Sequence, residues 1–246
     1  MNRFANLSLF PWLTFLLGAV GYGLRLWLLA SLDENNLLQT SHPAGIICIF
    51  LLLFLLFFYF LVVRNLVPIA QYGLLFPRSP LAIAGNVAAG AGFLYSGYTR
   101  LSGTGAILGV LFLVMSILAT LGILYAGFCR LKGQRCHYMV RTYICFYLML
   151  HLVFSCRSWG SDSQVQMYLF PLLASLFLVL ASYYRTVLDS QKSDRRPYII
   201  LTQSALFCCM LSLKGDSSLY YLAMAFWMAT DCCNTKPKPA RYLKKK

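Results

Sequence analysis

Apolar and polar residues alternate in long blocks along this chain. Eight apolar stretches each approach the roughly 20 residues that a helix needs to cross the hydrocarbon core of a bilayer. They cover residues 9–31, 44–67, 80–99, 105–130, 138–156, 166–187, 198–213 and 218–233. Residues 235–246 form a basic tail that is too polar to pack. The pattern predicts an all-α fold: one domain, residues 1–234, that is a polytopic helical membrane bundle with eight transmembrane helices.

The third and seventh stretches carry the weakest signals, because the third is rich in glycine and the seventh is short and contains Gln203 and Ser204. Small residues recur in the third at every fourth position: Ala84, Ala88, Gly92 and Ser96. Such spacing lets neighbouring helix backbones approach closely. We expect this face to pack inside the bundle, and lining of a cavity is the alternative.

The basic residues predict the orientation of the helices. The chain is 59% hydrophobic and only 11% charged, with a formal net charge of +14. With the N-terminus inside, 17 of the 21 Lys and Arg residues fall on the cytoplasmic side; the other four are Arg25, Arg100, Arg157 and Lys214. The positive-inside rule therefore predicts a plasma or inner membrane protein with both termini cytoplasmic. No motif that reads DNA or RNA accompanies the basic clusters, so the expected partner is the lipid bilayer and not nucleic acid.

Acidic and metal-binding residues limit the chemistry. All seven acids lie between the apolar stretches or at their ends. Ion-coupled carriers usually hold a paired acid at membrane depth, so ion coupling is disfavoured. The nine cysteines follow no disulfide or zinc spacing, and phosphate-binding loops and dinucleotide motifs are absent. We therefore predict no metal site and no cofactor.

Polar residues gather where the fifth apolar stretch ends and the sixth begins. The candidate ligand-binding residues are Arg157, Trp159, Asp162, Gln164 and Gln166, with Arg25 and His151 on the same side of the membrane. An arginine there can bind a carboxylate or phosphate, a tryptophan can stack on a planar or apolar group, and glutamines can orient a ligand. The alternative is an ordinary interfacial turn in which Asp162 or Ser163 caps the next helix.

Short segments across the chain carry a family resemblance. They are Arg25-Leu26-Trp27-Leu28, Asp33, Leu37-Leu38, His42-Pro43-Ala44, Leu75-Phe76-Pro77, Arg157-Ser158-Trp159, Asp162, Gln164, Gln166, Trp227 and Asp231. In these segments the chain resembles an uncharacterised family of multi-pass membrane proteins from anaerobic gut bacteria. The resemblance implies bacterial origin and architecture, and it implies no catalytic residue.

Together these features favour a non-enzymatic membrane protein that binds or translocates a lipid or small amphipathic solute at a site open to the outer face. One alternative is an intramembrane lipid hydrolase that uses His151 and Ser155. The helix count is similar to that of small lipid-cleaving membrane hydrolases, but those depend on acids within the helices, which we do not expect here. The other alternative is an accessory subunit that docks a membrane-protein partner through the small-residue face or the basic loops.

Overall fold

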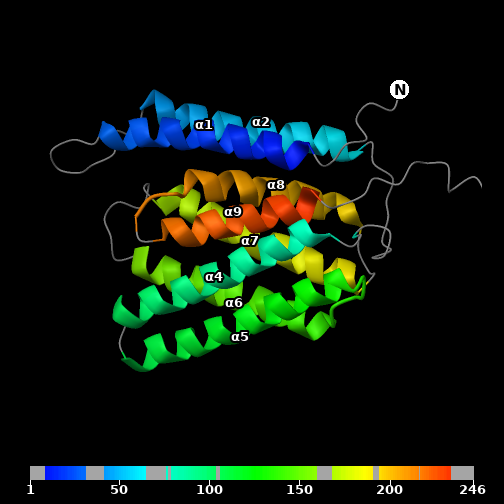
Figure 1. The fold of residues 1–246 in the computed structure, drawn as a ribbon. Helices are drawn as coiled ribbons and strands as arrows, with labels where there is room; N and C mark the ends of the chain where they lie inside the picture. The colour runs from blue at the N-terminus through cyan, green and yellow to red at the C-terminus, as the bar shows by residue number, and fades with distance from the viewer. Residues whose placement is uncertain are drawn as a thin grey trace, which may run out of the picture.

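The computed structural model describes residues 9–31, 42–64, 76, 79–103, 106–159, 168–190, 194–215 and 217–233. Secondary structure within these ranges is entirely helical (Figure 1). The helices are α1 (Phe10–Ala30), α2 (Pro43–Arg64), α4 (Pro80–Gly103), α5 (Ala106–Leu131), α6 (Tyr138–Trp159), α7 (Leu169–Asp189), α8 (Arg195–Leu211) and α9 (Ser218–Cys233). Each predicted stretch coincides with one of these eight helices, with ends that agree within four residues. The all-helical prediction is confirmed.

Five helices are long and apolar enough to cross a membrane: α1, α2, α5, α6 and α7. Helices α8 and α9 have only 17 and 16 residues. A helix surrounded by other helices does not need an apolar surface on every side. The chain therefore has the composition and helices of an integral membrane protein, and its least apolar helices need protein neighbours.

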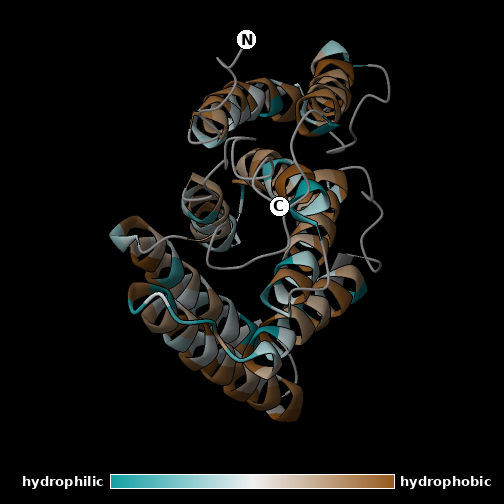
Figure 2. Cartoon of the chain, turned by 90° about the vertical axis from the view of Figure 1, so that its right-hand side faces the viewer, coloured by the Kyte–Doolittle hydropathy of each residue, from teal (hydrophilic) through white to brown (hydrophobic). Residues whose placement is uncertain are grey.

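The helices from α4 to α9 form a ring of neighbours in chain order. Each packs against the next, and α9 packs back against α4. Helices α1 and α2 pack against each other and lie outside this ring, against α8 (Figure 1). Viewed nearly along the helix axes, the α1–α2 pair lies on one side of the remaining helices (Figure 2). The fold is thus three sequential hairpins closed into a ring, with a fourth hairpin on its outside.

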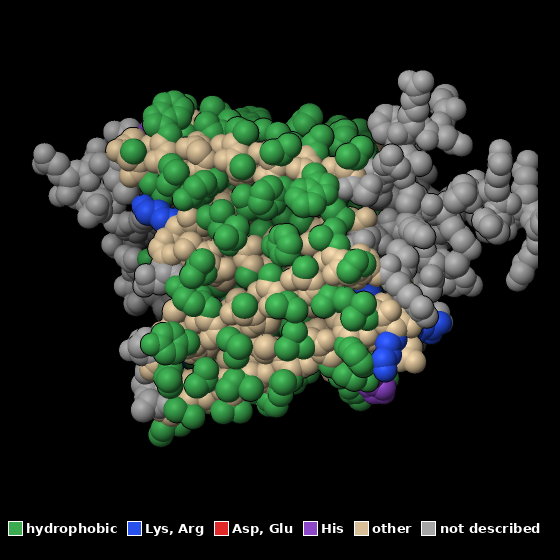
Figure 3. Space-filling view, viewed as in Figure 1, with side chains coloured by type: hydrophobic (Ala, Val, Ile, Leu, Met, Phe, Trp, Pro, Cys, Tyr) green, Lys and Arg blue, Asp and Glu red, His purple; other side chains and the backbone are tan. Residues whose placement is uncertain are grey.

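Consecutive helices run antiparallel, so charged residues gather at two ends of the bundle. We call the end that contains Arg130, Arg141 and Arg185 the basic end; it is on the right in Figure 1. The opposite end contains Arg25, in the second half of α1, and Arg100, in the last turn of α4. Between the two ends, the face seen in Figure 3 is covered with apolar side chains, and Lys and Arg lie only near its ends. A broad apolar band between two charged rims is what a bilayer-spanning surface requires.

Helix α8 explains why its own sequence signal is weak. Most of its residues are buried, including Gln203 and Ser204. The Gln203 Oε1 atom accepts a hydrogen bond from Thr14 of α1 at 2.7 Å, and its Nε2 atom lies 3.0 Å from the sulfur of Cys232 in α9. Because α8 is enclosed by α1, α2, α7 and α9, its polar side chains meet protein partners and not lipid.

Helix α4 packs through glycines on two of its faces. Gly85 and Gly92 face α9, where a Cβ atom on Gly92 would come within 2.8 Å of the Ala223 Cβ. Gly90 and Gly97 face α5 in the same way, against Thr120 and Ser116. The predicted small-residue face is therefore only partly correct: Gly92 and Ser96 are buried, but Ala84 is exposed. The glycines that allow the closest approach recur every seventh residue on each face.

Candidate functional site

The ligand-binding rim predicted around residues 157–166 lies mostly outside the described part of the chain. Asp162, Gln164 and Gln166 are not among the described residues, and Trp159 is placed only as the last residue of α6. Arg157 is exposed in the last turn of the same helix. The rim therefore remains a prediction, with Arg157 accessible for it.

Arg25 and His151, the other two predicted ligand-binding residues, are buried inside the opposite end. The Arg25 guanidinium donates a hydrogen bond to the carbonyl of Leu211 and lies 5.6 Å from the ring centre of Phe170. His151 stacks on Tyr220, with 4.2 Å between ring centres. Arg25 thus ties α1 to α7 and α8, and His151 ties α6 to α9.

Ser155, the nucleophile of the hydrolase alternative, lies one turn after His151. Its hydroxyl accepts a hydrogen bond from the Arg100 guanidinium at 2.6 Å, and that guanidinium also lies 4.9 Å from the ring centre of Phe112. Ser155 therefore joins α6 to the end of α4. The contact gives Ser155 and Arg100 a structural role that needs no catalysis.

Charged side chains meet inside the basic end, where Asp231 of α9 is the centre of one group. Its carboxylate is paired with Arg130 of α5 and accepts a hydrogen bond from the Tyr198 hydroxyl of α8. Arg185 of α7 lies 3.5 Å from the same carboxylate. The Arg185 guanidinium stacks on the ring of Phe76, 3.3 Å from its centre. Four helices of the ring are joined through this one acid.

Asp189, in the last turn of α7, is the second acid of this cluster. Its carboxylate lies 3.2 Å from Arg141 of α6 and 3.8 Å from Arg185, one turn earlier in its own helix. Arg185 therefore contacts both acids and connects the two groups. We call the connected side chains the polar layer: Arg130, Arg141, Arg185, Asp189, Tyr198 and Asp231.

The polar layer overturns part of the sequence interpretation. Asp189 and Asp231 lie near helix ends, as expected, but they are buried and ion-paired between helices, with exposed fractions of only 6% and 4%. The expectation that no paired acid lies within the helices is therefore wrong for Asp189 and Asp231. The expected lack of acids within the helices counted against the lipid-hydrolase alternative, and Asp189 of α7 and Asp231 of α9 remove that objection. Both carboxylates, however, form ion pairs with arginines.

Sequence reasoning missed the polar layer because the positive-inside rule accounted for its arginines as loop charges. One local signal was available: Arg185 and Asp189 are four residues apart, which places them on one face of a helix. A second was Asp231, which follows the apolar residues of α9 within the same helix. The Arg130–Asp231 pair joins positions 101 residues apart, and no local pattern reveals such a contact.

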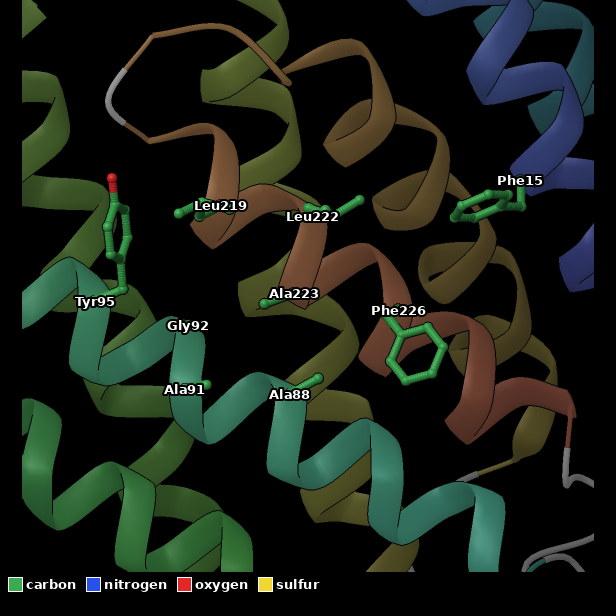
Figure 4. A pocket seen from close by; sticks show the side chains of 9 residues that line it. All are labelled: Phe15, Ala88, Ala91, Gly92, Tyr95, Leu219, Leu222, Ala223 and Phe226. Atoms are coloured by element: carbon green, nitrogen blue, oxygen red, sulfur yellow. The ribbon is translucent and has the colours of Figure 1, made fainter.

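An apolar groove lies on the outside of the ring, between α1, α4 and α9 (Figure 4). Its volume is about 620 Å³. It is lined by Phe15, Ala88, Ala91, Gly92, Tyr95, Leu219, Leu222, Ala223 and Phe226. Tyr95 stands at one end of it, on the side of α4 that leads to Arg100 (Figure 4). The small residues of α4 form the floor, so this face both packs and lines a cavity.

Cysteine and histidine side chains form no metal centre in the part of the chain that the structure describes: no three metal-binding side chains come together there. None of the nine cysteines forms a disulfide. Cys136, in the turn between α5 and α6, is buried, and burial raises the pKa of its thiol to about 11 although Arg141 acts in the opposite direction. This thiol is protonated at neutral pH and so is a poor metal ligand.

The family resemblance found in the sequence stays a prediction. No protein-family model, no curated protein and no solved structure matches this chain.

Proposed function

We propose that this chain is an integral membrane protein that binds a lipid or a small amphipathic solute, with the apolar groove as the site for the ligand's apolar chain. The groove carries the proposal. Its volume of about 620 Å³ lies within the range of roughly 300–1,000 Å³ that is typical of small-molecule sites. The only side-chain polar atom on its lining residues is the Tyr95 hydroxyl. Such a surface fits an acyl or other hydrocarbon chain and offers little to a polar solute.

The polar part of the ligand has its partners at the opposite end. Tyr95 lies at that end of the groove, and the exposed Lys214 lies just before α9, which forms one wall. Arg157 is exposed at the same end of the bundle. A ligand whose chain lies in the groove would place its headgroup among these residues.

The proposal includes the orientation derived from the charges: eight membrane crossings with both termini cytoplasmic, so that the groove opens toward the outer face. The antiparallel ring supports this, because it puts the short helices α8 and α9 beside helices that are long and apolar enough to span. A 16-residue helix is about 24 Å long, and small adjustments of the bilayer accommodate such a length.

The test is native mass spectrometry of gently solubilised protein, with lipids that co-purify as the readout. Ala91→Trp puts a large ring into the groove. Val87→Trp is the matched control, because Val87 is exposed one turn earlier on α4 and does not line the groove. We expect a retained lipid or amphipath in the wild type and in Val87→Trp, and its loss in Ala91→Trp.

Equal retention of the lipid in all three proteins would show that the groove is not its binding site. Arg157→Ala addresses the rim predicted from the sequence and does not touch the groove. Loss of the adduct in that variant would place the headgroup beside Arg157, and an unchanged adduct would assign it to the side of Tyr95 and Lys214.

A further inference from the structure

We propose that the polar layer at the basic end of the ring binds a phosphate group. This site is separate from the groove: it lies inside the ring at the other end of the bundle, and its ligand is an anion. Three observations support this site: the charge of the layer, the positions of the described acids and a buried amide beside the layer.

The layer carries one more positive than negative charge. Three guanidinium groups, those of Arg130, Arg141 and Arg185, face the two carboxylates of Asp189 and Asp231. The three arginines are each no more than 2% exposed, so water screens the excess charge poorly. An uncompensated buried charge is strongly unfavourable, and a bound anion removes that cost.

Among the described residues, no further acid contacts the layer. Asp194 is described, and its carboxylate lies 3.4 Å from Arg196. The remaining acids are Asp33, Glu34, Asp162 and Asp216, and each follows a described residue at the opposite end within three positions. Three residues extend at most about 11 Å, whereas the helices between the two ends are about 24–39 Å long. No acidic side chain follows Asp231 in the sequence.

Asn86 of α4 provides the independent observation. It is 1% exposed, and both its amide nitrogen and its amide oxygen lack a hydrogen-bond partner among the described residues. Its side chain packs against Gly127 of α5, one turn before Arg130, while the neighbouring Gly85 packs against Thr230, next to Asp231. Buried amides in proteins almost always have a partner. Asn86 therefore lies beside the layer with an unused donor, so every helix of the ring contributes a polar side chain at this level.

Phosphate suits these donors better than a spherical anion does. Guanidinium groups bind phosphate oxygens through paired N–H donors, and an amide N–H adds a further neutral donor. The phosphate can be that of an anionic lipid headgroup, for which basic pockets between transmembrane helices are known sites, or it can be free inorganic phosphate. The chemistry of the site is the same for both.

The experiment measures thermal unfolding of the detergent-solubilised full chain. Inorganic phosphate is added at constant ionic strength, balanced with sodium chloride. In a second arm, the chain is placed in nanodiscs of phosphatidylcholine with or without phosphatidylglycerol. Asn86→Asp puts a carboxylate of the same shape beside Arg130 and neutralises the layer. Gln134→Glu adds the same charge at an exposed position of the same end and serves as the control.

We expect near-saturating phosphate to raise the Tm of the wild type and of Gln134→Glu by about 3–6 °C, since a ligand that binds only the folded state stabilises it. Asn86→Asp should have a higher Tm without phosphate and no response to it. A response to phosphatidylglycerol alone would identify the lipid headgroup as the source, and a response to inorganic phosphate would identify the free anion.

Two outcomes overturn the proposal: a wild-type Tm that responds to neither probe, and an equal response in Asn86→Asp. If Asn86→Asp does not fold, Arg141→Gln gives a second test, because it removes one cation and leaves two arginines with two aspartates. Its response to phosphate should then be lost, and a retained response would contradict the site. Ala91→Trp, which fills the groove, should respond like the wild type, so failure of the groove proposal is separable from failure of this one.

Discussion

Single buried polar residues hold the apolar helices of this bundle in register. The Thr14 hydroxyl of α1 donates to the Phe10 carbonyl and to Gln203 Oε1 of α8, and it is also hydrogen-bonded to the Tyr59 hydroxyl of α2. All three side chains are at most 1% exposed. Lipid offers no hydrogen bonds, so a polar side chain inside an apolar bundle has to find its partner on another helix. One threonine thereby fixes how the α1–α2 hairpin meets the ring.

This network predicts a measurable coupling between Thr14 and Gln203. In a double-mutant cycle of Thr14→Val and Gln203→Leu, the two losses of stability should be non-additive by about 0.6–1.7 kcal/mol, as found for hydrogen bonds between membrane helices. Unfolding in mixed micelles measures the four proteins. Thr142→Val is the control, because Thr142 is exposed and bonds only within its own helix turn; its coupling to Gln203 should be near zero. Additive losses for Thr14 and Gln203 would show that the bond contributes nothing.

The thiol of Cys136 gives a prediction with a pH dependence. Burial raises its pKa from the ordinary value of 9.0 to about 11. Only the thiolate reacts with alkylating reagents, so at pH 8 the reaction should be about 100-fold slower than at an ordinary thiol. Its rate should keep rising with pH toward 11, whereas an ordinary thiol levels off near pH 9.

Peptide mass spectrometry after timed alkylation measures this rate. Gln134→Cys supplies an exposed thiol in the same segment, and tryptic cleavage after Arg135 separates it from Cys136. Equal rates at the two positions below pH 9 would show that the Cys136 thiol is neither buried nor shifted in its pKa.

Whole helices were easier to predict from the sequence than contacts between them. Length and hydropathy located all eight helices, because an apolar run of about 20 residues has few other folded states. They did not show which helices lie inside. Helix α4 illustrates why: its small residues were recognised, but the closest contacts are made by Gly85 and Gly92 toward α9 and by Gly90 and Gly97 toward α5. The arrangement of the ring decides which face of α4 packs against which helix. The spacing of small residues within α4 does not reveal that arrangement.

Close packing of α4 on α9 predicts that Gly85→Ala destabilises the bundle. The added methyl group would overlap the Thr230 side chain, whose hydroxyl donates a hydrogen bond to the Trp227 carbonyl, so a rotation that relieves the overlap breaks this bond. Overpacking of this kind costs about 1–3 kcal/mol. Gly23→Ala in α1 is the matched control, because nothing lies within 4 Å of its Cβ position. That variant should be neutral or slightly more stable, since alanine favours helix more than glycine.

Denaturation of both variants in the same detergent measures the difference. A Gly85→Ala protein as stable as Gly23→Ala would mean that α4 and α9 are farther apart than the structure places them.

At the scale of the whole molecule, the charge distribution along the sequence and the packing of the helices assign the basic residues to the same two ends of the bundle. The residues that the positive-inside rule assigned to one side include Arg130, Arg141 and Arg185, and the ion pairs bring these three together at the basic end. The rule uses only their positions between apolar stretches, so it predicted which end they occupy. It could not predict that they turn inward toward Asp189 and Asp231, because it treats each charge as exposed to water.

Agreement between charge and fold makes the membrane orientation testable at two exposed positions. Gln134 lies between α5 and α6 at the basic end, and Lys214 lies between α8 and α9 at the opposite end. With both termini cytoplasmic, a cysteine at 214 in intact cells should react with a membrane-impermeant maleimide, while a cysteine at 134 should react only after the membrane is opened. The chain with its native cysteines, all buried or half-buried, serves as the blank.

The two positions also test whether α8 crosses the bilayer, which its own length and composition do not establish. Position 214 is separated from position 134 by α6, α7 and α8, which is an odd number of crossings if all three span the bilayer. If α8 did not cross, the two positions would lie on the same side and would label alike. Labelling of 134 alone in intact cells would keep the crossing of α8 and invert the orientation, and it would turn the groove of the proposed function toward the cytoplasm.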